Sequence, residues 1–245
     1  MRGNRTEGGE SNRAGLTFLL PLPFAMKLRP LLTTALAALA VLTTAVDAAS
    51  SRWEAELAAF ARADETRRPT PGGVVFVGSS SIRLWDGLEQ AFDRFPTVVN
   101  RGFGGSTIAE CAEHVDRLVS AHRPRTVVVY AGENDLAEGA TAEQVASRVR
   151  AFVERVRAEQ PAAHIAFVSI KPSPLRAELL PKVREANARI RAHLETVANA
   201  QFIDVHTAML DPNGHPRAEL FGPDRLHMSA AGYALWRREI SARLP

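Results

Sequence analysis

Three short turns and one acid–histidine pair hold the residue types in this sequence that could do chemistry. The turns span residues 78–80, 102–105 and 132–135 and read Gly-Ser-Ser, Gly-Phe-Gly-Gly and Gly-Glu-Asn-Asp. The first and third follow apolar runs that favour a strand buried inside a parallel sheet, and the second follows a short predicted strand over 97–100. Parallel strands end along one edge, where open α/β sheets bind ligands, so we expect the turns to converge on one cleft.

The acid–histidine pair is Asp224 and His227, three residues apart. Positions three apart share a face in a helical turn, so the carboxylate can hold one imidazole nitrogen and free the other as a base. One of the three consecutive serines at 79–81 would then complete a serine–histidine–carboxylate arrangement, in which the base activates the hydroxyl. The alternative for these serines is that they only cap a helix.

Strand-like and helix-like segments alternate along the chain, and they must position these groups. A leading amphipathic helix is expected over 51–63 and a loop over 67–73, and amphipathic stretches then separate the apolar runs. That order demands a parallel sheet with helices on both faces, an α/β fold. The five predicted strands are 74–77, 97–100, 126–130, 164–170 and 201–205.

Composition fits a globular domain with an amino-terminal extension. The 245 residues are 46% hydrophobic and 23% charged, enough to bury a sizeable core. The net charge of +3, without a clustered basic face, predicts no nucleic-acid partner. Cys111 is the single cysteine, which excludes an intrachain disulfide, and its place beside an apolar helix stripe favours a buried structural role.

The amino terminus predicts an export signal. A basic start at Met26, an apolar run over 31–46 and small residues before Ala49 have the order of a signal peptide. The apolar run is short of the about 20 residues that a membrane span needs, although an uncleaved anchor is the alternative. Residues 1–25 are atypical of a signal, so Met26 is the simplest true start.

From this terminus we expect a secreted or periplasmic protein without stable membrane insertion after cleavage. Residues 1–48 would be the signal with an overlong start, and 49–72 the leading helix and loop. Residues 73–245 would be the functional domain.

The four motifs together resemble the SGNH, or GDSL-type, hydrolases over about residues 73–242. The resemblance implies a flavodoxin-like, three-layer α/β/α fold with a five-stranded parallel sheet, and an esterase activity. One position departs from the family pattern: Ser79 stands where aspartate is common. The family motifs match at Gly78-Ser79-Ser80, at 100–105, at Gly132-Glu133-Asn134-Asp135 and at Asp224-Arg225-Leu226-His227.

Residue by residue, the resemblance implies a division of labour. Ser80 would attack an ester carbonyl, with His227 as its base and Asp224 orienting that base. The backbone N–H groups of Ser80 and Gly105 and the side-chain amide of Asn134 would form the oxyanion hole. Alternation along an extended backbone also predicts that the two neighbouring serines point away from Ser80.

The other candidate residues have plainer interpretations. Asp135 more simply braces its turn, and Trp85 is more typical of core than of an acyl pocket. The six histidines besides His227 show no convincing metal-ligand spacing, so we expect neither a metal nor a cofactor.

Four other functions remain to be weighed. The α/β-hydrolase motif Gly-x-Ser-x-Gly fails because Ile82 stands at its second glycine. A flavodoxin-like cofactor binder lacks a phosphate-cradling loop at Gly78. A non-catalytic glycan- or lipid-binding module would have no need for Ser80, Asn134, Asp224 and His227 together. An acyltransferase shares the acyl-enzyme step and stays open. The expected substrate is a small-molecule, glycan or lipid ester with a short acyl or acetyl group.

Overall fold

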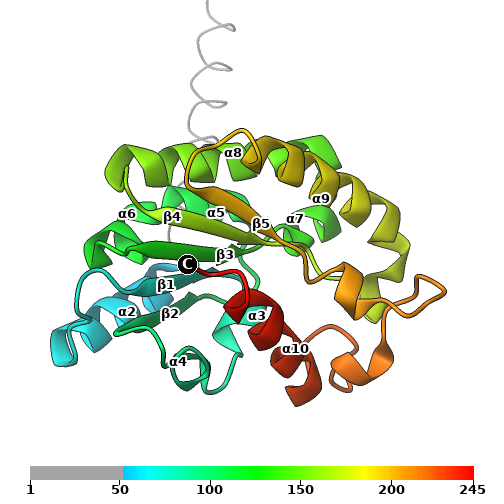
Figure 1. The fold of residues 1–245 in the computed structure, drawn as a ribbon, viewed down its shortest axis with the longest axis horizontal. Helices are drawn as coiled ribbons and strands as arrows, with labels where there is room; N and C mark the ends of the chain where they lie inside the picture. Colours follow the sequence, from blue (N-terminus) through cyan, green and yellow to red (C-terminus); the bar gives the residue numbers. More distant parts are fainter. Residues whose placement is uncertain (1–51) are drawn as a thin grey trace, which may run out of the picture. The chain divides into compact units, whose positions relative to one another are not determined.

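A five-stranded, all-parallel sheet forms the middle of three layers (Figure 1). The computed structural model describes residues 52–245, so the predicted signal segment, 1–48, lies outside the described residues. The strand order is β2-β1-β3-β4-β5, which is the flavodoxin-like order. The strands are β1 (Val74–Gly78), β2 (Val98–Gly102), β3 (Thr126–Tyr130), β4 (His164–Val168) and β5 (Ala200–Ile203).

The predicted fold class is confirmed, with small differences at strand ends. Strand β2 begins one residue later than predicted, and β4 ends two residues earlier. Just after β4, Ser169 still donates its N–H to Ile203 of β5, and its hydroxyl accepts from the backbone N–H groups of Val205 and His206.

Helices cover both faces of the sheet. The first face packs against α2 (Glu54–Thr66), α5 (Ile108–Glu113), α6 (Val115–Leu118), α8 (Ala142–Glu159) and α9 (Leu180–Leu194). The second packs against α3 (Ser80–Arg83), α4 (Leu88–Ala91) and α10 (Ala230–Ser241). The remaining elements are α7 (Glu133–Ala137), η1 (Ser120–His122), η2 (Pro174–Leu179), η3 (Thr207–Met209) and η4 (Ala218–Leu220).

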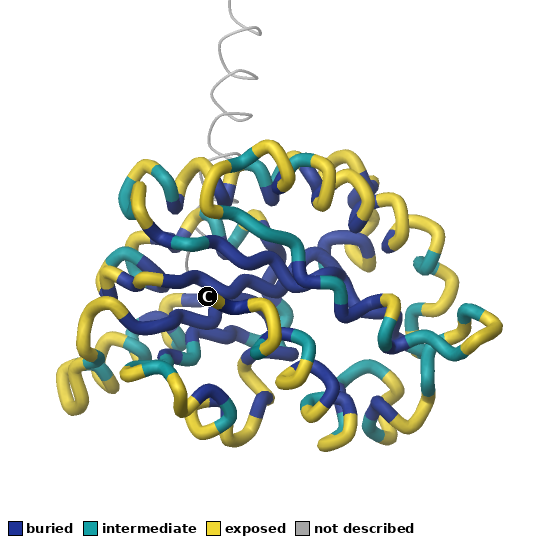
Figure 2. The backbone as a smooth tube through the Cα atoms, viewed as in Figure 1, coloured by how far each residue is buried: buried dark blue, intermediate teal, exposed yellow. Residues whose placement is uncertain are grey.

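Strands β1 and β3 are buried along their whole length (Figure 2). Side chains alternate across a strand, so Val75 and Val77 pack in the first core while Val74 and Phe76 pack in the second. In the second core Phe76 packs edge-to-face with Trp85, which is 4% exposed. This burial agrees with a core role for that tryptophan.

Two helices begin where the sequence places caps. Thr107 and Glu110 form a capping box at the start of α5, and Thr141 and Gln144 form one at the start of α8. Each box satisfies two backbone N–H groups that a helix start leaves without partners. Cys111, on α5, is fully buried, and burial raises the pKa of its thiol.

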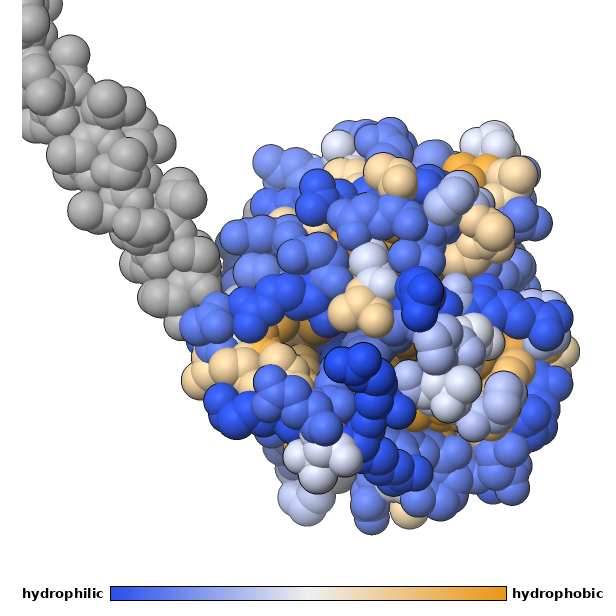
Figure 3. Space-filling model, turned by 90° about the vertical axis from the view of Figure 1, so that its left-hand side faces the viewer, coloured by the Kyte–Doolittle hydropathy of each residue, from blue (hydrophilic) through white to orange (hydrophobic). Residues whose placement is uncertain are grey.

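None of the helices of residues 52–245 is long and apolar enough to cross a bilayer. The face in Figure 3 is mainly hydrophilic, and its hydrophobic side chains lie in small separate patches.

The end of β1 requires glycine. Gly78 has a φ of +148°, and a Cβ there would lie 1.9 Å from the carbonyl oxygen of Tyr130 on β3. That oxygen also accepts a hydrogen bond of 3.1 Å from the N–H of Ser79. The close approach of the two backbones therefore leaves no room for a side chain.

We predict that Gly78→Ala destabilises the fold by more than the about 1–3 kcal/mol that an unfavourable backbone conformation alone costs. Gly139→Ala is the matched control, because Gly139 also has a positive φ, +96°, but no atom within 4 Å of its Cβ position. Urea unfolding of both variants measures the difference. Equal losses of stability in the two variants would contradict the steric argument.

Candidate active site

Ser80 lies at the point where β1 gives way to a helix. It is the first residue of α3, and Ser79 before it is the extended N-cap residue. Ser80 Oγ is 3.0 Å from Nε2 of His227. Ser79 and Ser81 are 4% and 1% exposed, so both neighbours are buried while Ser80 contacts the imidazole.

Strand alternation was predicted to separate the Ser80 side chain from those of its two neighbours, and this prediction was wrong. The backbone of Ser80 and Ser81 is helical rather than extended, so strand alternation does not separate the three side chains. Successive side chains of a helix are instead about 100° apart, and this rotation turns Ser81 toward the core.

Asp224 holds the other side of the imidazole. Its Oδ2 is 2.6 Å from Nδ1 of His227, and its Oδ1 accepts bonds of 3.0 Å from the backbone N–H groups of Leu226 and His227. These two N–H groups and the imidazole N–H lower the pKa of Asp224 to about 2. The carboxylate is therefore a fixed acceptor for Nδ1–H.

The segment that carries this pair is a loop, so the helical-turn geometry used to explain its spacing does not apply. The loop is closed by an antiparallel bridge between Phe221 and Met228 and by a bond of 2.8 Å from Gly222 N–H to the His227 carbonyl. Arg225 takes a left-handed φ of +58° inside it. The three-residue spacing still joins acid and histidine, because the loop turns the backbone N–H groups onto the carboxylate.

The Asp224–His227 and His227–Ser80 contacts form one hydrogen-bonded chain from carboxylate to hydroxyl. With Nδ1–H donated to Asp224, the lone pair of Nε2 faces Ser80 Oγ. This tautomer suits a base that takes the serine proton. The side chains of His227 and Asp224 are 31% and 50% exposed, so this hydrogen-bonded chain is accessible from the protein surface.

Strand register places Ser80 between the other two predicted turns. Gly78 of β1 is paired with Gly102 of β2 on one side and with Tyr130 of β3 on the other. The turns that carry Ser80, Gly105 and Asn134 therefore leave the sheet at the same level, from three adjacent strands.

Two backbone N–H groups at this edge have no partner. Within residues 52–245, no acceptor bonds the N–H of Ser80 or of Gly105. The first is at a helix start, where N–H groups lack intrahelical acceptors. Gly105 has a φ of +83°, while a Cβ there would meet nothing closer than 3.5 Å. Glycine thus suits this position through its backbone conformation, rather than through the clearance that its missing Cβ gives.

The side chain of Asn134 is bonded at both ends of its amide. Nδ2 donates to the carbonyl oxygen of Ser106 at 3.0 Å, and Oδ1 accepts from Nη1 of Arg176 at 3.1 Å. The second Nδ2 hydrogen is not used in these contacts. Asn134 can thus donate one further bond beside the turn that carries Gly105.

Asp135 braces the same turn, as its position in the motif suggested. It is fully buried. Its Oδ2 accepts from the N–H of Ile108 at 2.9 Å, and its Oδ1 accepts from Arg148 at 2.7 Å. The carboxylate thus ties the turn after β3 to the helix that follows the glycine turn after β2.

Sequence reasoning missed a buried polar cluster beneath the site. Glu133, buried at 5% exposure, pairs with Lys171, which is 1% exposed, and accepts a bond of 3.0 Å from the Tyr130 hydroxyl. Lys171 also donates to Ser173 at 2.9 Å. The only sequence signal was a glutamate at the variable position of the third motif, because its partner is 38 residues away.

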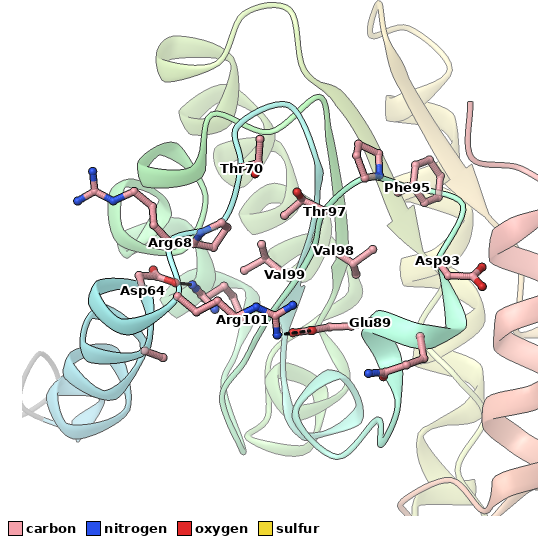
Figure 4. Close-up of a pocket in the computed structure, with 15 residues that line it drawn as sticks. Asp64, Arg68, Thr70, Glu89, Asp93, Phe95, Thr97, Val98, Val99 and Arg101 are labelled. Atoms are coloured by element: carbon pink, nitrogen blue, oxygen red, sulfur yellow. Dashed lines mark hydrogen bonds and ion pairs between the residues drawn. The ribbon is translucent and has the colours of Figure 1, made fainter.

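A hollow beside the edge strand β2 is separate from this site. It lies between α2 and α4, where Arg101 pairs with Asp64 and Arg67 pairs with Glu89. Figure 4 draws the residues that line it. Ser80, Asp224 and His227 are absent from its lining. Across residues 52–245, no cluster of three or more His, Cys, Asp or Glu side chains is suited to hold a metal ion.

Known proteins resemble the chain in sequence and in fold. Platelet-activating factor acetylhydrolase IB subunit alpha1 from Bos taurus is 31% identical over 169 residues, covering 65% of this chain and 69% of that protein. A Streptococcus pneumonia structure named for platelet activating factor superposes with a TM-score of 0.69 at 19% identity, covering 83% of this chain and 98% of that one. An acetyl-xylooligosaccharide esterase from Geobacillus Stearmophilus gives a TM-score of 0.57 at 16% identity, covering 71% and 94%.

The sequence also matches the GDSL-like Lipase/Acylhydrolase family over residues 72–235, a range that contains the whole sheet and every group of the site described above. The chain therefore belongs to the GDSL-like lipase/acylhydrolase family.

Proposed function

We propose that the protein is a serine esterase that hydrolyses carboxylic esters with short acyl or acetyl groups. The observation that carries the proposal is the hydrogen-bonded line from Asp224 through His227 to Ser80, with contacts of 2.6 and 3.0 Å. The 3.0 Å contact has an ordinary hydrogen-bond length, and the 2.6 Å contact is short, as bonds to a charged carboxylate tend to be. A purely binding module on the same fold would have no use for a base held against a hydroxyl.

The reaction follows from the order of these groups. Ser80 Oγ attacks the ester carbonyl carbon while Nε2 of His227 takes the hydroxyl proton. The tetrahedral intermediate collapses, the imidazolium returns that proton to the leaving alcohol, and the acyl group stays on Ser80. Water then attacks the acyl-enzyme with His227 again as base, which releases the acid and restores the serine.

The negative oxygen of the intermediate needs fixed donors. The free N–H groups of Ser80 and Gly105 and the remaining Nδ2 hydrogen of Asn134 are the three donors we assign. Removing one such donor typically costs about 10²–10³-fold in rate. Because the three donors belong to adjacent strand ends, the fold sets their spacing before substrate arrives.

Two observations support a short acyl group. The bovine relative is named an acetylhydrolase, at 31% identity. The side chains of His227 and Asp224 are partly exposed, which indicates an open site. An open site suits an ester whose larger part, a sugar or a lipid headgroup, stays in solvent.

The proposed site of action lies outside the cytoplasm, with residues 1–48 removed as a signal peptide. The support is the basic start, apolar run and small residues of that segment. We predict that mass spectrometry of the native protein finds an amino terminus at or near Ala49. Recovery of an intact residue 1–48 segment on a cytoplasmic protein would contradict this location.

For the nucleophile, we predict that Ser80→Ala abolishes hydrolysis of p-nitrophenyl acetate with water as the only acceptor. Ser79→Ala and Ser81→Ala are the matched controls and should keep most of the activity, since both side chains are buried away from the imidazole. Steady-state rates of the three variants, each checked for folding by circular dichroism, test the assignment. Near wild-type turnover by Ser80→Ala would end it, and activity only with an added alcohol acceptor would favour an acyltransferase.

The pH dependence should show one ionisation on the acid side. A neutral imidazole is the base, so kcat/KM should rise with pH on the acid side. Asp224 stays ionised because its pKa is lowered to about 2, so it should not contribute near pH 4, where an ordinary carboxyl titrates. A pH profile of kcat/KM measures this, and a second acid-side ionisation near pH 4 would show that the carboxylate is not held as described.

A further inference from the structure

Arg176 contacts the side chains of two consecutive residues of α7. Its Nη1 is 3.1 Å from Oδ1 of Asn134 and 3.6 Å from Oε1 of Glu133. Arg176 comes from η2, after the end of β4, and its side chain is 20% exposed. One guanidinium therefore serves both the assigned oxyanion donor and the buried carboxylate beside it.

The chemistry of its partners fixes the orientation of the Asn134 amide. A guanidinium can only donate hydrogen bonds, and the carbonyl oxygen of Ser106 can only accept them. The observed orientation satisfies both, with Oδ1 toward Arg176 and Nδ2 toward Ser106. A flipped amide would set N–H against the guanidinium and oxygen against oxygen. The unused Nδ2 hydrogen is thus held in one direction.

The positive charge also strengthens the donor. Hydrogen bonds to a charged group are stronger than neutral ones, and bonds in a chain reinforce one another. A cation on Oδ1 draws electron density from the amide, so Nδ2–H becomes a better donor to a negative oxygen. This gain is larger for the oxyanion of the transition state than for the neutral ester, so it should act on kcat more than on KM.

The carboxylate of Glu133 also holds the guanidinium of Arg176 in place. Oε1 of this glutamate has no hydrogen-bond partner within residues 52–245, and Arg176 is the cation that faces it. Burial would raise the pKa of Glu133, but Lys171, Ser173 and Arg176 together lower it. A buried carboxylate held ionised in this way keeps the guanidinium in place.

From these contacts we propose that Arg176 is a positioning residue for the esterase reaction, acting through Asn134 to aim and strengthen one donor of the oxyanion hole. This inference rests on the function proposed above. The competing account is a structural one, in which Arg176 only balances the charge of Glu133.

A double-mutant cycle with p-nitrophenyl acetate separates the two accounts. We expect Arg176→Met to lower kcat about 10-fold, part of the about 10²–10³-fold that one donor contributes, with little change in KM. In an Asn134→Ala background the same substitution should cost nothing further, because the donor it serves is gone. Arg176→Lys should recover part of the loss, since lysine keeps the charge but not the fork.

Arg189→Ala is the matched control. Arg189 lies on α9 and makes exposed ion pairs with Glu185 and Glu143, so its removal should leave kcat unchanged in both backgrounds. A loss from Arg176→Met that is equally large with and without Asn134 would overturn the positioning role in favour of the structural one. An unchanged kcat would overturn it as well.

A spectroscopic readout keeps this inference separate from the proposed function. The side-chain amide signal of Asn134, assigned by its loss in Asn134→Ala, should shift in Arg176→Met and stay in place in Arg189→Ala. An unmoved signal in Arg176→Met would overturn the proposal even if no ester were hydrolysed. Conversely, an inactive wild-type enzyme would defeat the esterase function while the amide signal still reported on Arg176.

Discussion

The pairing of β1 with its two neighbours, β2 and β3, is the constraint on which the site depends. Gly78 stands level with Gly102 and with Tyr130, so the turns after β1, β2 and β3 begin side by side. Slipping either pairing by one residue would move a turn by about 3.3 Å along the strand. A hydrogen bond does not tolerate such a displacement. The lack of room for a Cβ at Gly78 is one consequence of this close, level alignment.

Polar groups below the donors hold the turns in place. Asp135 ties the third turn to the N–H of Ile108 and to Arg148, and Glu133 ties it to Lys171 and Arg176. Buried charges are costly unless they are paired, and each of these carboxylates has a cationic partner. The result is a set of donors whose direction is set before any substrate binds, which is the condition for electrostatic stabilisation of an oxyanion.

Local patterns in the sequence were sufficient for the sheet and the motifs, but not for how some of the motifs fold. Apolar runs predicted β1 and β3 most clearly, because a strand buried along its whole length leaves a continuous hydrophobic signature. The edge strands β2 and β5 are only partly buried and leave a shorter one. Spacing joined Asp224 to His227 but suggested a helical turn, since three-residue separation does not reveal a left-handed residue such as Arg225. Strand alternation likewise failed at Ser80, where the helix begins immediately.

Local sequence patterns could not predict the roles of Arg176 and Lys171. Each reaches the third turn from the loop after β4, and the contact exists only because β3 and β4 are neighbours in the sheet. A lone arginine or lysine in a proline-marked loop has no periodicity and no motif around it. Contacts between side chains that follow different strands can therefore be identified only from the tertiary structure.

The central claim is that the edge of the sheet presents one activated serine. Its most direct test is to treat the wild-type protein with a fluorophosphonate and locate the adduct by tandem mass spectrometry of the peptide that carries the three serines. The account predicts a single adduct, on Ser80, because its hydroxyl is the one held against His227. An adduct on Ser79 or Ser81, or none on this peptide while ester hydrolysis is inhibited, would contradict it.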